Sequence, residues 1–175
     1  MTSELLILVV EAIAVYFLVL GAHALRGRYG LAHFYALIGG LTAVMVWVTD
    51  AGVRVEIPGV SFMVGSTVFY TALLLGVFVV YVFDGPRATR IAILTIIGLG
   101  IMVPVVTAVL HFQIQLSSDG AEAAYCPPQS VRIYTASIVA AFADLIFLAM
   151  AWEFLGKPRL NMPLWLRSFL TLLGV

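Results

Sequence analysis

Two carboxylic acids, Glu11 and Asp144, stand inside long apolar stretches of the sequence. A charged carboxylate near the centre of a membrane helix costs at least ~2.5 kcal/mol, so such residues usually have a function. Either one could bind a ligand or handle a proton. The alternative is a neutral or locally paired carboxylate that fixes helix packing, with Glu11 hydrated near a membrane surface.

Further polar residues stand near the ends of the apolar stretches. They are Ser66, Tyr70, His111, Gln115 and Arg132, and they offer a ring for stacking and several hydrogen-bonding groups. We expect these side chains to converge with Glu11 in an outward-facing pocket for a small flat heterocycle, with Asp144 deeper as its floor or as a packing group. The alternative is that His111, Gln115 and Arg132 only extend toward the membrane interface.

Motifs of catalysis are missing from the sequence. There is no GxSxG, HExxH or glycine-rich phosphate loop, and the three histidines stand in different apolar segments. The single cysteine, Cys126, has no partner for a disulfide and no neighbouring set of metal ligands. We therefore expect no enzymatic activity, no bound metal and no cofactor.

The composition is that of an integral membrane protein. Of the 175 residues, 63% are hydrophobic and 10% are charged, whereas about 25% are charged in a typical soluble domain. The formal net charge is +0, which argues against a nucleic-acid partner because phosphate binding needs a basic surface. The lipid bilayer is the expected partner of most of the surface.

The central apolar stretch, residues 62–83, carries no charge. As a helix it would extend about 33 Å, the thickness of a bilayer core. Its polar residues Ser66, Tyr70 and Tyr81 fall on one face with Asp84, the residue that follows it, and this face should contact protein. Asp84-Gly85-Pro86 then ends the helix.

Five more apolar segments complete the expected fold, an all-α bundle of six membrane helices. They cover residues 5–25, 31–49, 91–112, 131–155 and 163–175, and the last is too short to cross a bilayer. Residues 50–59 alternate in polarity and predict a short strand or hairpin outside the membrane. We expect residues 1–175 to form a single transmembrane domain, the N-terminal membrane portion of a longer protein.

Basic residues cluster in alternate connections. Residues 26–30, 84–90 and 156–162 each hold two Lys or Arg, whereas Asp50, Glu56, Asp119 and Glu122 lie in the other two connections. Because Lys and Arg are retained in the cytoplasm, this pattern predicts a multi-pass cell-membrane protein with its N-terminus outside.

Several short motifs resemble those of the VUT family. They are Arg28-Tyr29-Gly30-Leu31, Gly65-Ser66-Thr67-Val68-Phe69, Arg132-Ile133 with Ala136-Ser137, Asp144, and Leu164-Trp165-Leu166-Arg167. The VUT family contains the queuosine precursor transporters and is similar in architecture to the substrate-binding subunits of vitamin uptake systems. The resemblance implies a membrane bundle that binds a small molecule.

The departures from the transporter pattern are informative. Ser66 stands where the transporters usually have Asn, Ala141 where Gln is usual, and Ser168-Phe169 where paired Asn are usual. Asp84-Gly85-Pro86 resembles the sensory members of the family, in which the bundle is fused to a signalling domain. The resemblance thus implies a sensory input module with a downstream signalling domain. The alternatives are an uptake protein for a nucleobase-like or vitamin-like compound and a structural membrane partner without a ligand.

Overall fold

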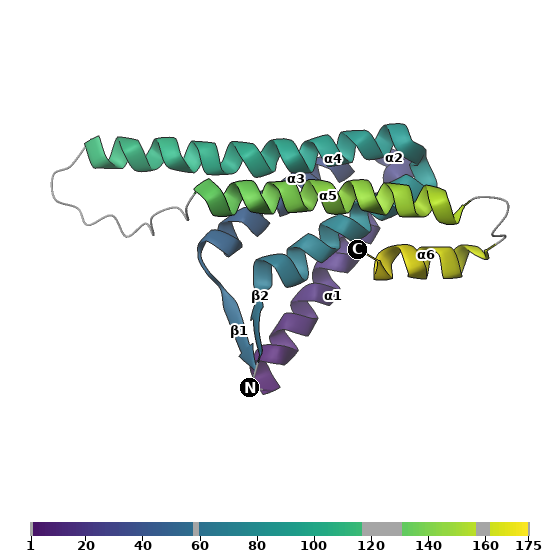
Figure 1. The fold of residues 1–175 in the computed structure, drawn as a ribbon, viewed down its shortest axis with the longest axis horizontal. Helices are drawn as coiled ribbons and strands as arrows, with labels where there is room; N and C mark the ends of the chain where they lie inside the picture. The colour runs from purple at the N-terminus through teal and green to yellow at the C-terminus, as the bar shows by residue number, and fades with distance from the viewer. Residues whose placement is uncertain (1, 58–59, 117–130, 157–161, 175) are drawn as a thin grey trace.

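The fold is almost entirely helical. The computed structural model describes residues 2–57, 60–116, 131–156 and 162–174. In chain order they form α1 (Thr2–Ala24), α2 (Arg26–Tyr29), α3 (Ala32–Asp50), β1 (Arg54–Ile57), β2 (Val60–Met63), η1 (Gly65–Tyr70), α4 (Thr71–Leu116), α5 (Val131–Leu155) and α6 (Leu164–Leu173) (Figure 1). The all-α prediction is confirmed, with one hairpin as its only strands in the described chain.

Four helical stretches in the described residues are long and apolar enough to cross a membrane: Glu4–Ala24, Ala32–Asp50, Gly65–Leu110 and Ile138–Leu155. Large apolar side chains point outward from them, as with Phe17, which is 72% exposed, and Leu94, which is 69% exposed. In water such surfaces would aggregate, whereas in a bilayer they contact lipid. The protein is therefore a membrane protein.

The long helix α4 contains a sharp break at Gly85. This residue has φ 82° and ψ −178°, a conformation that is nearly exclusive to glycine. The break divides the stretch from Gly65 to Leu116 into two rods, and each is at least about 30 Å long at 1.5 Å per residue. Helix resumes at once with Pro86, whose fixed φ suits a first helical turn, so Arg87 and Arg90 lie in helix and not in the loop predicted for residues 84–90.

The hairpin corrects the start of the third apolar segment. The sequence predicts helix from residue 62, but Val60–Met63 forms strand β2 and the helix starts at Gly65. Strand β2 pairs antiparallel with β1, Arg54 opposite Met63 and Ile57 opposite Val60. The alternating polarity of β1 provides a partner strand, and its backbone hydrogen bonds outweigh the helical preference of these few residues.

Side-chain contacts establish the directions of the helices. Tyr16 contacts Thr71 and His23 contacts Asp84, so α1 runs parallel to the first half of α4. Tyr70 bonds Asp144 and Tyr81 bonds Glu153, so α5 runs parallel to the same half. Helix α3 runs the opposite way, because its start lies against Gly76 and its end against Gly65. The second half of α4 runs the same way as α3, because Tyr35 bonds Ala88 and Gly39 lies against Leu99. Successive rods therefore alternate in direction.

The core lies where α1, α3 and the first half of α4 meet. Val19, Phe34, Ile38, Val77 and Val80 are all 0% exposed there. Gly76 sits among them, because a side chain would meet Ile38 and Val19. A smaller cluster of Phe78, Tyr81, Leu148 and Trp152 joins α4 to α5.

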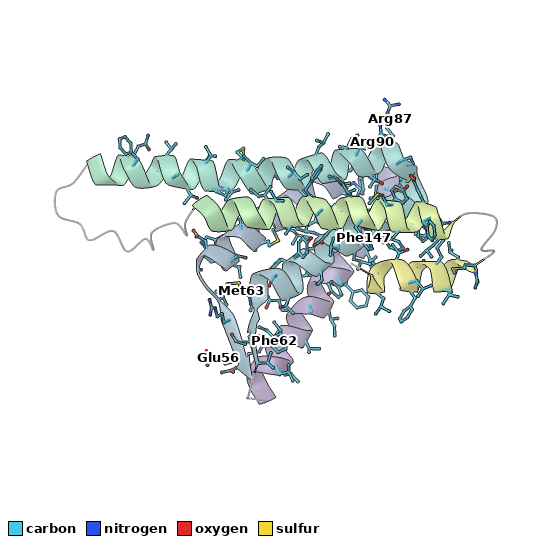
Figure 2. The ribbon with its side chains drawn as sticks, viewed as in Figure 1. Glu56, Phe62, Met63, Arg87, Arg90 and Phe147 are labelled. Carbon is cyan, nitrogen blue, oxygen red and sulfur yellow. The ribbon has the colours of Figure 1, made fainter. Side chains whose placement is uncertain are left out.

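The charged residues of the connections between helices lie at opposite ends of the molecule. Figure 2 places Arg87 and Arg90 just after the break in α4, and Glu56 on the hairpin at the other side of the molecule. All three side chains are exposed. The basic and acidic connections thus occupy different ends, as alternating helix directions require.

Candidate functional site

A cavity of about 270 Å³ lies between α3, the hairpin, η1, the second half of α4, and α5. Its walls are mainly apolar, with a few hydroxyl and carboxylate groups among them. The lining residues are Thr42, Met45, Val46, Thr49, Asp50, Met63, Ser66, Tyr70, Ile96, Ile97, Gly100, Ile138, Ala140, Ala141 and Asp144. A mostly apolar cavity with a few polar groups is the usual form of a small-molecule site.

A hydrogen bond between Tyr70 and Asp144 stands at the wall of the cavity. The Tyr70 hydroxyl donates to Oδ2 of Asp144 over 2.6 Å, and both side chains are half-buried. The bond holds the phenol ring and the carboxylate side by side on facing helices. A carboxylate has about four acceptor positions, so one bond from Tyr70 leaves Asp144 able to accept more.

The turn η1 brings Ser66 and Tyr70 to the cavity together. It is π-helical from Gly65 to Tyr70, a wider turn that is frequent at functional sites. The Thr71 hydroxyl donates to the carbonyl oxygens of Thr67 and Val68, which the wider turn leaves available, at 2.7 and 3.1 Å. Because the Thr71 hydroxyl hydrogen is already donated to these carbonyl oxygens, the Tyr16 hydroxyl is the donor in its 2.6 Å contact with Thr71. Helix α1 therefore supports the turn from outside the cavity.

Gly65 packs closely against Met45 and Thr49, two residues of α3 that line the cavity. A side chain at this position would overlap the Thr49 hydroxyl and come within 3.2 Å of the Met45 carbonyl oxygen. Ser66, the next residue, donates to the Met63 carbonyl oxygen over 3.2 Å and lines the cavity. Glycine at this position allows η1 to pack directly on α3.

The structure brings together three of the residues predicted from the sequence. Ser66, Tyr70 and Asp144 line the same cavity, although Asp144 lies beside Tyr70 and hydrogen-bonds to it. Glu11 lies on α1, which contributes no residue to this cavity, so the structure does not bring it to the other three. The side chains of His111, Gln115 and Arg132 lie outside the described part of the chain, so their predicted roles stay predictions.

Sequence reasoning missed most of the cavity wall. Thr42, Val46 and Thr49 share one side of the second apolar segment, and this stripe was a usable signal for the α3 wall. Asp50 was assigned to a loop, but it ends α3 and lines the cavity. Ala140 and Ala141 of the fifth apolar segment also line the cavity.

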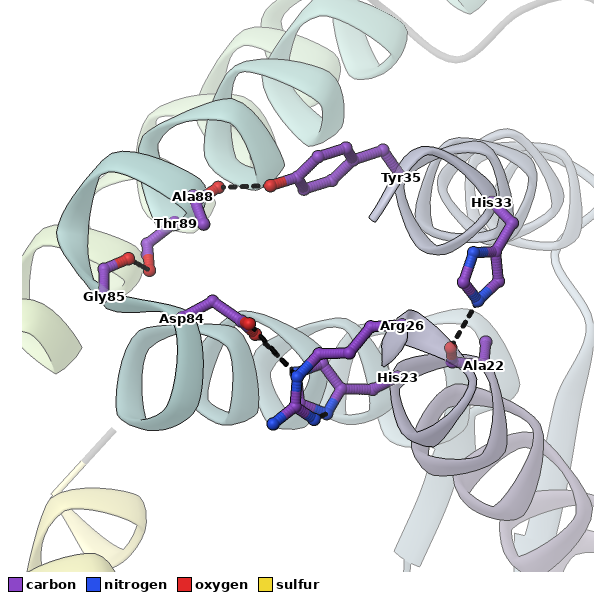
Figure 3. A network of polar contacts seen from close by, with 9 residues as sticks. All are labelled: Ala22, His23, Arg26, His33, Tyr35, Asp84, Gly85, Ala88 and Thr89. Carbon is purple, nitrogen blue, oxygen red and sulfur yellow. Dashed lines mark hydrogen bonds and ion pairs between the residues drawn. The ribbon is translucent and has the colours of Figure 1, made fainter. Parts of the chain in front are cut away.

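A second polar cluster lies at the break in α4 (Figure 3). The guanidinium of Arg26 lies 3.0 Å from Nδ1 of His23. Because a guanidinium can only donate hydrogen bonds, Nδ1 must be the acceptor, and the ring hydrogen of His23 is on Nε2. Nε2 then donates to Oδ2 of Asp84 over 2.6 Å, and Arg26 pairs with Oδ1 over 3.2 Å. This cluster ties α1 and α2 to the break and lies apart from the cavity lining.

The same end of the molecule has two further bonds to backbone oxygens. Tyr35 donates to the Ala88 carbonyl oxygen over 3.1 Å, and Thr89 donates to that of Gly85 over 2.9 Å. The acceptors are Gly85, the residue at the break, and Ala88 in the first turn after it, as Figure 3 shows. We interpret the whole cluster as a structural anchor that fixes the angle between the two halves of α4.

A comparison with protein-family models found a match to the family described as vitamin uptake-like sensor, over residues 16–175. The chain belongs to this family. The matched residues include every element that lines the cavity. The resemblance to sensory relatives of vitamin-uptake proteins is thereby confirmed, and membership of the family supports a sensing or small-molecule-binding role. Comparisons with curated proteins and with solved structures returned no match.

Proposed function

We propose that this member of the vitamin uptake-like sensor family is the ligand-binding input module of a signalling protein. A small flat compound would occupy the cavity between α3, η1, α4 and α5. The observation that carries the proposal is the Tyr70–Asp144 pair, two polar groups held side by side in the wall of a mainly apolar cavity. A phenol ring and a carboxylate can stack against a flat ring and accept its hydrogen bonds. The role proposed is binding and signalling, not catalysis.

A cavity-filling variant tests this proposal. Ala141→Leu should fill the cavity, and Ala143→Leu is a matched control on the same helix, because Ala143 is exposed and does not line it. The purified proteins, in detergent, would be heated with a panel of nucleobases, 7-deazapurines and water-soluble vitamins. A ligand at 100 times its Kd stabilises a protein by about 2.7 kcal/mol, which gives a measurable rise in melting temperature.

We expect at least one compound to stabilise the wild-type protein and the Ala143→Leu variant but not Ala141→Leu. Stabilisation of all three proteins alike would place the binding elsewhere, and no stabilisation by any compound would count against the pocket. In proteoliposomes the same compound should bind without accumulating in the lumen. Accumulation would support the alternative role in uptake.

We also propose that the protein crosses the membrane several times, as a bundle of six helices with α6 as the sixth and the N-terminus outside. The alternating directions of the rods and the concentration of basic residues at the end with the break support this arrangement. Single cysteines at Glu56 and Arg87, in a background in which Cys126 is replaced by Ser, test it. An impermeant thiol reagent added outside intact cells should label the first position and miss the second. The reverse pattern would overturn the orientation.

A further inference from the structure

The cavity contains acidic groups but no basic ones among its described lining residues. Asp144 and Asp50 both line it, together with hydroxyl groups and apolar side chains, and no Lys, Arg or His is among the described residues that do so. The polar part of the wall therefore accepts hydrogen bonds and carries negative charge. An anionic ligand would be repelled by such a wall, and a cationic one attracted.

The second Tyr–carboxylate pair on the same helices shows what is distinctive about Asp144. Tyr81 donates to Oε1 of Glu153 over 2.7 Å, nearly the same geometry as the Tyr70–Asp144 bond of 2.6 Å. Glu153 is exposed and lies next to Trp152, on whose ring the Arg167 guanidinium stacks at 3.7 Å. Its negative charge thus has solvent and a nearby cation.

Among the described residues no ion pair holds Asp144, and its side chain is half-buried where that of Glu153 is exposed. Its described hydrogen bond comes from a neutral phenol, and it lies about halfway along α5 in an apolar region. A carboxylate at such a position is stabilised by a positive or strongly donating partner, since an unpaired charge away from water is costly. The cavity beside it is the space in which such a partner can bind.

The shape of the cavity restricts that partner further. The volume of about 270 Å³ is slightly below the usual range for small-molecule sites, roughly 300–1,000 Å³. Met45 and Met63 line it with flexible side chains that contact aromatic rings favourably, and Tyr70 adds a ring of its own. A single or fused flat ring fits these walls better than a chain or a sugar.

We infer that the cavity selects a flat ring compound bearing a positively charged nitrogen group, such as an amine or an amidine, whose N–H groups donate to Asp144. This inference rests on the proposed function, because it assumes that the cavity is a ligand site. Two parallel N–H donors would bind both oxygens of one carboxylate, and hydrogen bonds of this kind are the strong, charge-assisted type. Tyr70 positions the carboxylate through its own bond.

Three probes of the same shape test the inference: benzamidine, which is cationic, benzamide, which is neutral, and benzoate, which is anionic. Their binding to the protein in phosphatidylcholine nanodiscs would be measured by saturation-transfer NMR, with empty nanodiscs subtracted. We expect benzamidine to bind more tightly than benzamide, and benzoate most weakly. Asp144→Asn keeps an acceptor for the Tyr70 hydroxyl but removes the charge, so benzamidine should bind about 10- to 100-fold more weakly while benzamide changes little.

Glu153→Gln is the matched control. It alters the other Tyr–carboxylate pair on the same helix, outside the described lining of the cavity, and should leave the order of the three probes unchanged. Retained benzamide binding in Asp144→Asn shows that this variant is folded. Equal binding of the three probes, a preference for benzoate, or an unchanged preference for benzamidine in Asp144→Asn would overturn the ligand class and leave the pocket standing. Failure of all three probes to bind saturably would overturn the pocket itself, and the ligand class with it.

Discussion

Replacement of Gly76 by alanine should destabilise the bundle, because at this glycine α4 packs directly against side chains of both α1 and α3. The added methyl carbon would lie 2.8 Å from Cδ1 of Ile38 and 3.1 Å from Cγ1 of Val19, with Phe34 at 3.4 Å. The Ile38 and Phe34 side chains are fully buried and belong to the core. Overpacking of this kind typically costs about 1–3 kcal/mol.

Alanine favours the helix more than glycine does, which works against the expected loss of stability. A reference variant is therefore needed to separate the two effects. Gly→Ala inside a helix gains up to about 1 kcal/mol, so the net loss at Gly76 is smaller than the overpacking cost. Gly98 is also inside α4 but has no atom within 4 Å of an added methyl carbon, so Gly98→Ala shows the gain alone. The difference in unfolding free energy between the two variants should therefore be about 1–3 kcal/mol.

A second substitution identifies the atom responsible. Ile38→Val removes Cδ1, the nearest atom, and by itself should cost about 0.5–1.5 kcal/mol. Combined with Gly76→Ala it should cost less than the sum of the two, with a coupling of about 1 kcal/mol. The assay is equilibrium unfolding by SDS in mixed micelles, followed by far-ultraviolet circular dichroism. Equal stabilities of the Gly76→Ala and Gly98→Ala variants, or strict additivity with Ile38→Val, would refute the packing argument.

Three further substitutions test the end of the bundle at the break. Asp84→Ala should cost about 1–3 kcal/mol in the same unfolding assay, because His23 is buried, at 4% exposed, and loses its hydrogen-bond acceptor. An unchanged stability would mean that the cluster at the break is not a structural anchor. Gly85→Ala should cost a similar ~1–3 kcal/mol because of its φ of 82°. Gly27→Ala is the control: it lies in α2 and meets no atom within 4 Å, so it should not destabilise the protein. Arg167→Gln removes the side chain that holds α6 on α5 through the Trp152 carbonyl oxygen. With a loss of about 2 kcal/mol, the amides of Leu164–Leu173 should exchange hydrogen about 30-fold faster. Unchanged exchange would show that other contacts hold α6.

The long helices were predictable from the sequence because each is a continuous apolar run with charge at its ends. The fifth segment was predicted at residues 131–155 and α5 is Val131–Leu155, and the first two segments agree within three residues at either end. The hairpin was predicted only as an option, since the pairing of residues 54–57 with residues 60–63 competes with a helical pattern that continues through residue 62. The immediate restart of helix at Pro86 was missed, because Gly-Pro usually marks a loop.

The candidate site was predictable where polar residues interrupt apolar helices. Ser66, Tyr70 and Asp144 stand out in the sequence for that reason, and all three line the cavity. Ile96 and Ile97 also line it, but nothing distinguishes them from the isoleucines that face lipid. Whether such a residue lines the cavity or faces lipid depends on how the helices pack together. That packing cannot be deduced from one segment at a time.

The pairing of the two tyrosines with the two acids of α5 also depends on those contacts. Tyr70 and Tyr81 are eleven positions apart, and Asp144 and Glu153 are nine, a difference of about 3 Å along parallel helices. The longer side chain of Glu153 helps to span this difference, so both bonds form at 2.6–2.7 Å. Because hydrogen bonds of this type weaken beyond about 3.0 Å, sliding α5 along α4 by one residue, ~1.5 Å, would strain both bonds together. The two pairs therefore fix the register of α5, and with it the position of Asp144 at the cavity.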